Sequence, residues 1–95
     1  FYHILINNKV HESVGGQPTA AKYVDLYAVV KAMQVSKMFK VKTNSELKLK
    51  INEFIECDGP SFMEIEVSPG SREALGRPTI KPSDNKENFM KFLKK

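Results

Sequence analysis

The pattern of apolar and polar residues differs between segments of the chain, and the first segment is an unbroken apolar run. Residues 4–6 read Ile-Leu-Ile and end at Asn7 and Asn8. Such runs are typical of parallel strands covered on both faces, so we expect a central strand here. A polar loop with two glycines follows, and ligands of open α/β sheets bind beyond the carboxyl ends of strands. The pattern therefore predicts a strand that ends at a site.

Two later stretches alternate with a period of two and predict shorter strands. Over 38–41, Phe39 and Val41 face one way and the lysines face the other. Over 62–67, three apolar side chains share a face opposite two glutamates. Both patterns indicate strands with one polar face.

Helical spacing separates these strands. Asp25 can cap a helix over about 25–34, whose apolar stripe consists of Leu26, Val29, Val30 and Met33. Thr43 and Glu46 have the spacing of a capping box, and Gly59-Pro60 ends the second helix. The apolar face of that helix consists of Leu47, Ile51, Phe54 and Ile55.

Beyond the last strand the chain is rich in residues that break regular structure. Pro69-Gly70 predicts a turn, and Gly76, Pro78 and Pro82 predict an irregular arm lying over the domain. Ser83 or Asp84 can cap a final helix that must dock its apolar side chains, Phe89, Phe92 and Leu93. We divide the chain into an α/β body (1–68), an arm (69–83) and a C-terminal helix (84–95).

Strands that alternate with helices predict an α/β fold with parallel crossovers. Only three strands are expected, and two of them alternate instead of being apolar throughout. We therefore expect a truncated parallel sheet with flanking helices, and interpret the chain as the C-terminal fragment of a larger domain.

Composition narrows the class of protein. The 95 residues allow one small domain, and 41% hydrophobic with 27% charged residues is ordinary for a globular protein. No apolar stretch approaches membrane-spanning length, no signal peptide is evident, and a single cysteine, Cys57, excludes an internal disulfide. We expect a cytoplasmic protein with no membrane partner. The net charge is +4, but the lysines are interspersed with glutamates, so nucleic-acid binding is not expected.

Two long strings resemble one family of enzymes. They are Asn-Asn-Lys-Val-His-Glu-Ser-Val-Gly-Gly-Gln-Pro-Thr at 7–19 and Gly-Ser-Arg-Glu-Ala-Leu-Gly-Arg-Pro-Thr at 70–79. Together they resemble the C-terminal part of phosphonopyruvate decarboxylases, and Asn7-Asn8 resembles the closing half of the Gly-Asp-Gly…Asn-Asn signature of thiamine diphosphate enzymes. No Gly-Asp-Gly precedes Asn7, so we expect that part, and an N-terminal pyrimidine-binding domain with its activating glutamate, to lie outside this chain.

The resemblance implies a site built around Mg²⁺ and thiamine diphosphate. Asn8 would bind the metal through its side-chain oxygen and Val10 through its backbone carbonyl, since Mg²⁺ prefers hard oxygen ligands. The simpler alternative for an asparagine pair after a strand is a turn. His11 would contact substrate or cofactor, or donate a proton, although a loop histidine often does neither. Ser13 would contact the diphosphate.

Arg72 and Arg77 can bind a phosphonate or carboxylate group, or can instead form ordinary surface ion pairs. The implied reaction is the decarboxylation of 3-phosphonopyruvate, a 2-oxo acid, to phosphonoacetaldehyde in aminoethylphosphonate metabolism. A homo-oligomer is expected. Sulfopyruvate decarboxylase, with a substrate of similar shape, and a non-catalytic α/β binding module remain the alternatives.

Overall fold

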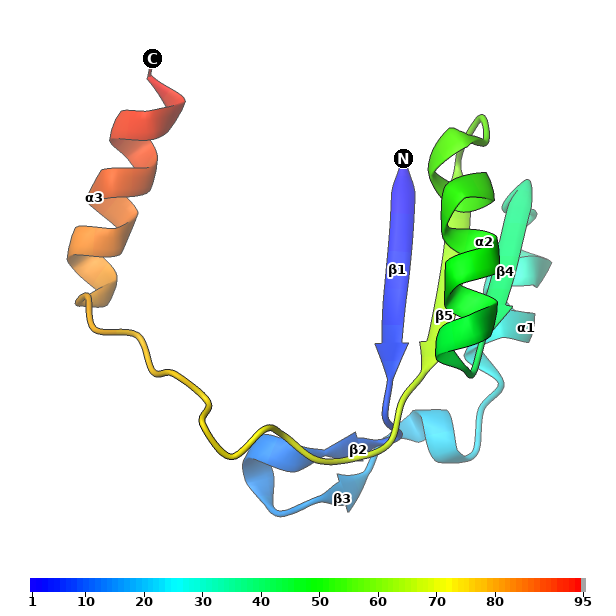
Figure 1. Ribbon diagram of the computed structural model, residues 1–95, viewed down its shortest axis with the longest axis horizontal. Helices are drawn as coiled ribbons and strands as arrows, with labels where there is room; N and C mark the ends of the chain where they lie inside the picture. The colour runs from blue at the N-terminus through cyan, green and yellow to red at the C-terminus, as the bar shows by residue number, and fades with distance from the viewer. Residues whose placement is uncertain (95) are drawn as a thin grey trace.

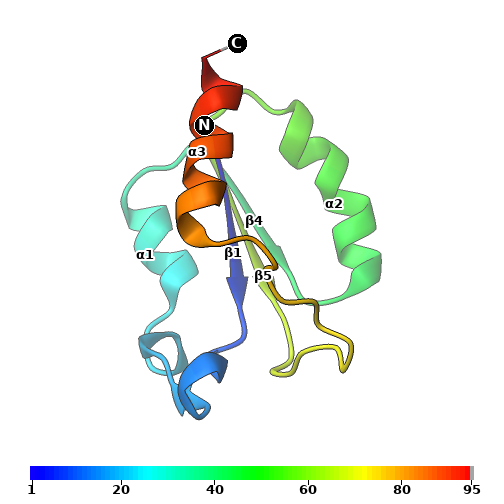
Figure 2. The ribbon, with the colours of Figure 1, turned by 90° about the vertical axis from the view of Figure 1, so that its left-hand side faces the viewer.

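The computed structural model describes residues 1–94. Its main sheet has three parallel strands in the order β1-β5-β4, which are β1 (Tyr2–Asn7), β4 (Lys37–Val41) and β5 (Ser61–Glu66). Helix α1 (Leu26–Ala32) lies on one side of the sheet and α2 (Asn44–Glu56) on the other (Figure 2). The predicted α/β class, a short parallel sheet with flanking helices, is confirmed.

The core lies between α2 and the two strands that this helix connects. Phe39 and Val41 of β4, Phe54 of α2 and Met63 of β5 are buried together. The rings of Phe39 and Phe54 meet edge to face at 5.7 Å, a favourable arrangement of aromatic side chains. Cys57, at the end of α2, is half-buried and packs against this cluster as a small apolar side chain.

The predicted capping residues of α1 and α2 are observed. The Asp25 carboxylate accepts a hydrogen bond from the backbone N–H of Ala28. Thr43 and Glu46 form the complete capping box at the start of α2. These side chains satisfy N–H groups that the first helical turn leaves without partners.

The start of the last helix was predicted incorrectly. Helix α3 (Pro82–Leu93) begins at Pro82, after Lys81, and neither Ser83 nor Asp84 caps it. Proline is well suited to the first helical position, where its missing N–H leaves no bond unmade and its fixed φ favours the helix. Pro82 therefore starts the helix instead of prolonging the arm.

The arm between β5 and α3 does not lie over the domain as predicted. Residues 67–81 form no helix or strand, and they lead away from the sheet to α3 (Figure 1). The radius of gyration is 17.0 Å, whereas a compact chain of this length has about 12 Å. The arm and α3 therefore extend outward, and the apolar side chains of α3 are exposed.

Strand β1 is at an edge of the described sheet, and β5 is its central strand. Ile4 and Ile6 are 46% and 59% exposed, because α2 covers β4 and β5 on this face. The expectation that the apolar run forms a central, fully covered strand is therefore not met in residues 1–94. An apolar strand with an open edge agrees with the predicted truncation of the sheet.

Candidate functional site

Two consecutive turns follow β1. The side-chain oxygen of Asn7 accepts a hydrogen bond from the N–H of Lys9 at 3.1 Å, and that of Asn8 accepts one from the N–H of Val10 at 3.1 Å. Asparagine forms such turns readily because its short side chain reaches the backbone two residues ahead. Lys9 has a φ of 62°, which is uncommon for a residue with a side chain. Both asparagines therefore hold the backbone in a turn at the end of β1.

Beyond the turns the loop forms a small antiparallel ribbon that the sequence did not reveal. Strand β2 (Val10–His11) pairs with β3 (Gln17–Pro18), and the short 3-10 helix Glu12–Val14 joins them. Gly15 and Gly16 have positive φ values of 92° and 72°. The two glycines therefore permit the turn, because a residue without a side chain adopts a positive φ at little cost.

The oxygens of Asn8 and Val10 are suited to the predicted metal. The Asn8 oxygen accepts one hydrogen bond and keeps a second lone pair, and its side chain is half-buried. Val10 pairs with Pro18, which has no N–H, so this partner cannot occupy the Val10 carbonyl. In residues 1–94, no three His, Cys, Asp or Glu side chains form a group that can hold a metal. Asn8 and Val10 therefore offer two neutral oxygens for a metal ion.

Hollows of about 400 Å³ and 410 Å³ flank the Asn8 loop. The first is lined by Asn8 and His11, together with residues of β1 and α1. The second is lined by Asn8 and Val10 and also by three charged residues, Lys9, Lys22 and Glu66. Oxygen ligands and two lysines around one hollow suit an anion that is bound together with a cation. Neither Lys9 nor Lys22 was predicted from the sequence to be a site residue.

His11 and Ser13 are both exposed on the loop. His11 lines the same hollow as Asn8. Ser13 lies in the 3-10 helix, and its hydroxyl forms no hydrogen bond with the described residues. Both side chains are thus accessible for the contacts predicted from the resemblance.

The two arginines do not join this loop. Arg72 and Arg77 are exposed on the arm, and Arg77 borders a separate hollow beside the start of α3. Neither lies in an ion pair within residues 1–94, so the alternative of local surface ion pairs is not observed there.

Glu12 connects the loop to the arm. One of its carboxylate oxygens accepts a hydrogen bond from the Asn8 amide at 2.8 Å, and the other accepts one from the backbone N–H of Gly70. The two strings on which the resemblance rests therefore meet in space, although 58 residues separate these partners. Glu12 therefore holds the loop against the arm.

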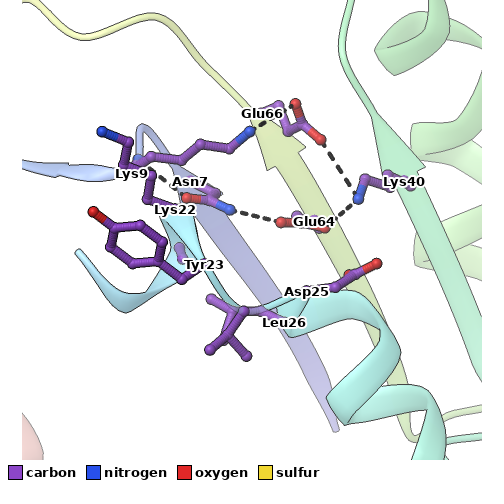
Figure 3. Close-up of a pocket in the computed structure, with 11 residues that line it drawn as sticks. Asn7, Lys9, Lys22, Tyr23, Asp25, Leu26, Lys40, Glu64 and Glu66 are labelled. Carbon is purple, nitrogen blue, oxygen red and sulfur yellow. Dashed lines mark hydrogen bonds and ion pairs between the residues drawn. The ribbon is translucent and has the colours of Figure 1, made fainter. Parts of the chain in front are cut away.

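A row of polar side chains lies under the turns, on the α1 side of the sheet (Figure 3). The amide nitrogen of Asn7 donates to Glu64 Oε1 at 2.7 Å, and Lys40 Nζ lies 3.1 Å from Glu64 Oε2. Glu64 is only 2% exposed. The interaction with Glu64 raises the pKa of the Lys40 amino group above its ordinary value of 10.5, although desolvation acts to lower it. The sequence had assigned Glu64 only to a polar face, because alternation cannot distinguish a buried carboxylate from a solvated one.

Glu66 completes the charged group at the end of β5. Lys9, Lys40 and Lys42 place their amino groups 3.4–3.6 Å from its carboxylate. Desolvation raises the pKa of Glu66, but the lysines outweigh it and the pKa lies below its ordinary value of 4.5. Glu66 is thus ionised at neutral pH and balances the lysines around the loop.

Two curated proteins are similar to nearly the whole of this chain. A phosphonopyruvate decarboxylase from Streptomyces hygroscopicus is 33% identical over 90 residues, which are 95% of this chain and 22% of that protein. A second, from Streptomyces viridochromogenes, is 32% identical over 91 residues, which are 96% of this chain and 23% of that protein. The chain thus spans less than a quarter of these relatives. The resemblance predicted from the two strings is confirmed.

Neither of the other comparisons adds to this result. No family model matches the chain, and no solved structure matches it. In the part of the chain that the structure describes, no helix has the length and apolar character needed to cross a bilayer.

Proposed function

We propose that this chain is the C-terminal part of a decarboxylase of 2-oxo acids that depends on thiamine diphosphate and Mg²⁺, with 3-phosphonopyruvate as substrate. The observation that carries the proposal is the similarity to two phosphonopyruvate decarboxylases over at least 95% of the chain. The loop after β1 supports it, because Asn8 and Val10 offer oxygens suited to Mg²⁺ beside a hollow that two lysines border.

Each residue of the loop has a distinct task in this proposal. The Asn8 side chain and the Val10 carbonyl hold Mg²⁺, and the Ser13 hydroxyl donates a hydrogen bond to the diphosphate. Lys9 and Lys22 supply positive charge beside the anionic cofactor. His11 contacts the substrate or donates a proton to it. When bound, thiamine diphosphate supplies the electron sink for cleavage of the carbon–carbon bond.

Other parts of the proposed enzyme are not in these 95 residues. They are the aspartate of a Gly-Asp-Gly segment as a further Mg²⁺ ligand, and a pyrimidine-binding domain with the activating glutamate. Arg72 and Arg77 are proposed to bind the phosphonate in the assembled enzyme, since both are exposed on an arm that extends away from the sheet. The enzyme is proposed to be a cytoplasmic homo-oligomer.

The test is an assay of the full-length protein with phosphonopyruvate and with sulfopyruvate, each with and without thiamine diphosphate and Mg²⁺. We expect carbon dioxide and phosphonoacetaldehyde from phosphonopyruvate only when both cofactors are present. If the protein prefers sulfopyruvate, the proposed substrate is wrong and sulfopyruvate takes its place. Failure to bind the cofactor and to turn over either substrate would favour a non-catalytic binding module.

A further inference from the structure

We propose that Glu64 is a positioning residue, which holds the metal-binding turn in place through Asn7. This inference rests on the proposed function, because it concerns the geometry of the Mg²⁺ ligands Asn8 and Val10. The residue that it adds to the proposed site is Glu64 of the central strand β5, which does not itself line the hollow beside those ligands.

The contact between Glu64 and Asn7 is buried and directed. The two residues are 2% and 7% exposed, and the amide nitrogen of Asn7 donates to Glu64 Oε1 at 2.7 Å. Because the nitrogen of the amide faces Glu64, its oxygen faces the opposite way, where it accepts from the N–H of Lys9 at 3.1 Å. Glu64 thus selects one of the two orientations of the Asn7 amide.

The orientation of Asn7 decides the conformation of the next turn. Lys9 adopts a φ of 62°, a conformation that costs free energy for a residue with a side chain and persists only when neighbours hold it. The bond from Lys9 to Asn7 supplies that restraint, and the following turn places the oxygen of Asn8 against the N–H of Val10. If the Asn7 amide were flipped, its nitrogen would face the N–H of Lys9. Two donors would then oppose each other, and the turn would lose its hydrogen bond.

Glu64 is itself fixed from the other side. Its second oxygen lies 3.1 Å from Lys40 Nζ, in an ion pair without the geometry of a directed hydrogen bond. Lys40 and Glu64 are register partners on adjacent strands, so the sheet sets their separation. Figure 3 shows the resulting row, in which Lys40, Glu64 and Asn7 connect three neighbouring strands. The row joins the centre of the sheet to the loop after β1.

The first experiment removes the acceptor from position 64 in the full-length protein. Glu64→Leu keeps most of the side-chain volume but cannot accept from Asn7, whereas Glu64→Gln keeps an oxygen that can. We expect the apparent Mg²⁺ affinity, measured by thiamine diphosphate binding at a series of Mg²⁺ concentrations, to fall about tenfold or more in Glu64→Leu. Glu64→Gln should stay within about threefold of wild type, because the hydrogen bond to Asn7 persists.

Glu66→Leu is the matched control. It removes a carboxylate from the same face of the same strand, two residues further on. That carboxylate pairs with Lys40 and with Lys9 and borders the hollow beside Asn8, but it accepts no hydrogen bond from Asn7. The Mg²⁺ affinity of Glu66→Leu should exceed that of Glu64→Leu. Melting curves without cofactor, recorded for each variant, separate loss of the fold from loss of the metal-binding geometry.

A second set of variants exchanges the donor and the acceptor between positions 7 and 64. It tests the inference even if Glu64→Leu does not fold. Asn7→Asp keeps the acceptor for Lys9 but sets two carboxylates against each other, so Mg²⁺ binding at pH 8 should weaken. Combining Asn7→Asp with Glu64→Gln restores a donor and an acceptor in the opposite order, and binding should recover relative to Asn7→Asp alone.

Two results would overturn the inference while leaving the proposed function intact. One is wild-type Mg²⁺ affinity in Glu64→Leu, and the other is an Asn7→Asp, Glu64→Gln double variant that binds no better than Asn7→Asp. If the wild-type protein shows no Mg²⁺-dependent binding of thiamine diphosphate, the proposed function fails, and the inference fails with it.

Discussion

Single side chains hold the backbone in place at the start of α2 and along the loop after β1. At the start of α2, Glu46 accepts hydrogen bonds from the N–H groups of Lys42 at 2.7 Å and Thr43 at 3.1 Å. The Thr43 hydroxyl accepts one from the N–H of Glu46 at 3.2 Å. Because the backbone donors of Lys42 and Thr43 favour the carboxylate, the pKa of Glu46 lies below its ordinary value of 4.5.

This capping box gives α2 a pH-dependent stability. A carboxyl group whose pKa is lowered by folding stabilises the native state above its unfolded pKa, and this contribution disappears as the pH falls through the folded value. We therefore expect Glu46→Ala to lower the melting temperature at pH 7, with the difference from wild type shrinking below about pH 4.5. Glu53→Ala, on the same helix outside the cap, is the control. A difference that does not depend on pH would contradict the argument.

Asn8 is the residue on which the proposed metal site depends most directly. In the full-length protein, Asn8→Ala should lower the apparent affinity for Mg²⁺ at least about tenfold, since even changes in the surroundings of metal ligands often cost that much. Added Mg²⁺ should partly restore activity. Asn52→Ala, an exposed asparagine on α2, is the control. Unchanged Mg²⁺ affinity together with a lower apo melting temperature would show that Asn8 is only a turn residue.

At the scale of elements, α2 and the strands it connects account for most of the buried apolar surface. Phe54 is 2% exposed and contacts the rings of Phe39 at 5.7 Å and Tyr2 at 5.6 Å. Leu49, on the same helix, is 80% exposed. One face of α2 therefore holds the sheet together, and the other contributes little to stability.

The contrast between these two positions is a direct test of the core. Phe54→Ala should destabilise the protein by about 3–5 kcal/mol, because it removes a buried ring and leaves a cavity. Leu49→Ala should change the free energy of unfolding by less than about 0.5 kcal/mol, as is usual for surface positions. Urea unfolding of both variants measures the difference, and similar losses would mean that α2 packs differently.

At the scale of the whole molecule, much apolar surface lacks a partner within residues 1–94. Ile4 and Ile6 are exposed on β1, and α3 exposes Phe89, Met90, Phe92 and Leu93 by 44–68%. Helix α3 has only 12 residues, and helices of this length are seldom stable alone in water. Both surfaces therefore require contacts that this arrangement of the chain does not supply.

We expect the 95-residue chain to associate with itself. An open strand edge and contiguous apolar side chains favour contacts between copies. Sedimentation should show dimers or larger species at high concentration, and Ile4→Lys with Ile6→Lys should shift the population toward monomer. A strictly monomeric wild-type profile would contradict the interpretation of a truncated sheet.

The same chain should have no decarboxylase activity by itself. It contains no Gly-Asp-Gly segment, and the proposed activating glutamate lies in another domain, so the reacting groups cannot be brought together. The measurement is carbon dioxide release from phosphonopyruvate by the purified chain, with the full-length protein as positive control. Turnover by the chain alone would require a different mechanism.

The sequence by itself determined features that depend on near neighbours along the chain. The capping residues Asp25 and Thr43 and the alternation around Phe39 were identified correctly, because hydrogen bonds three residues apart and a period of two are local properties. The resemblance of the two long strings was also available from sequence alone. The boundaries of helices were predicted less well. Pro82 was assigned to the irregular arm, but it is the first residue of α3.

Only the tertiary structure decided which polar residues are buried and which distant segments meet. Glu64 and Glu66 alternate identically in the sequence, yet Glu64 is buried in the centre of the sheet between Asn7 and Lys40, while Glu66 lies at the strand end. Glu12 meets Gly70 because the loop and the arm leave the same end of the sheet. Strand order and the path of the arm set these contacts, and neither is encoded in a pattern of neighbouring residues.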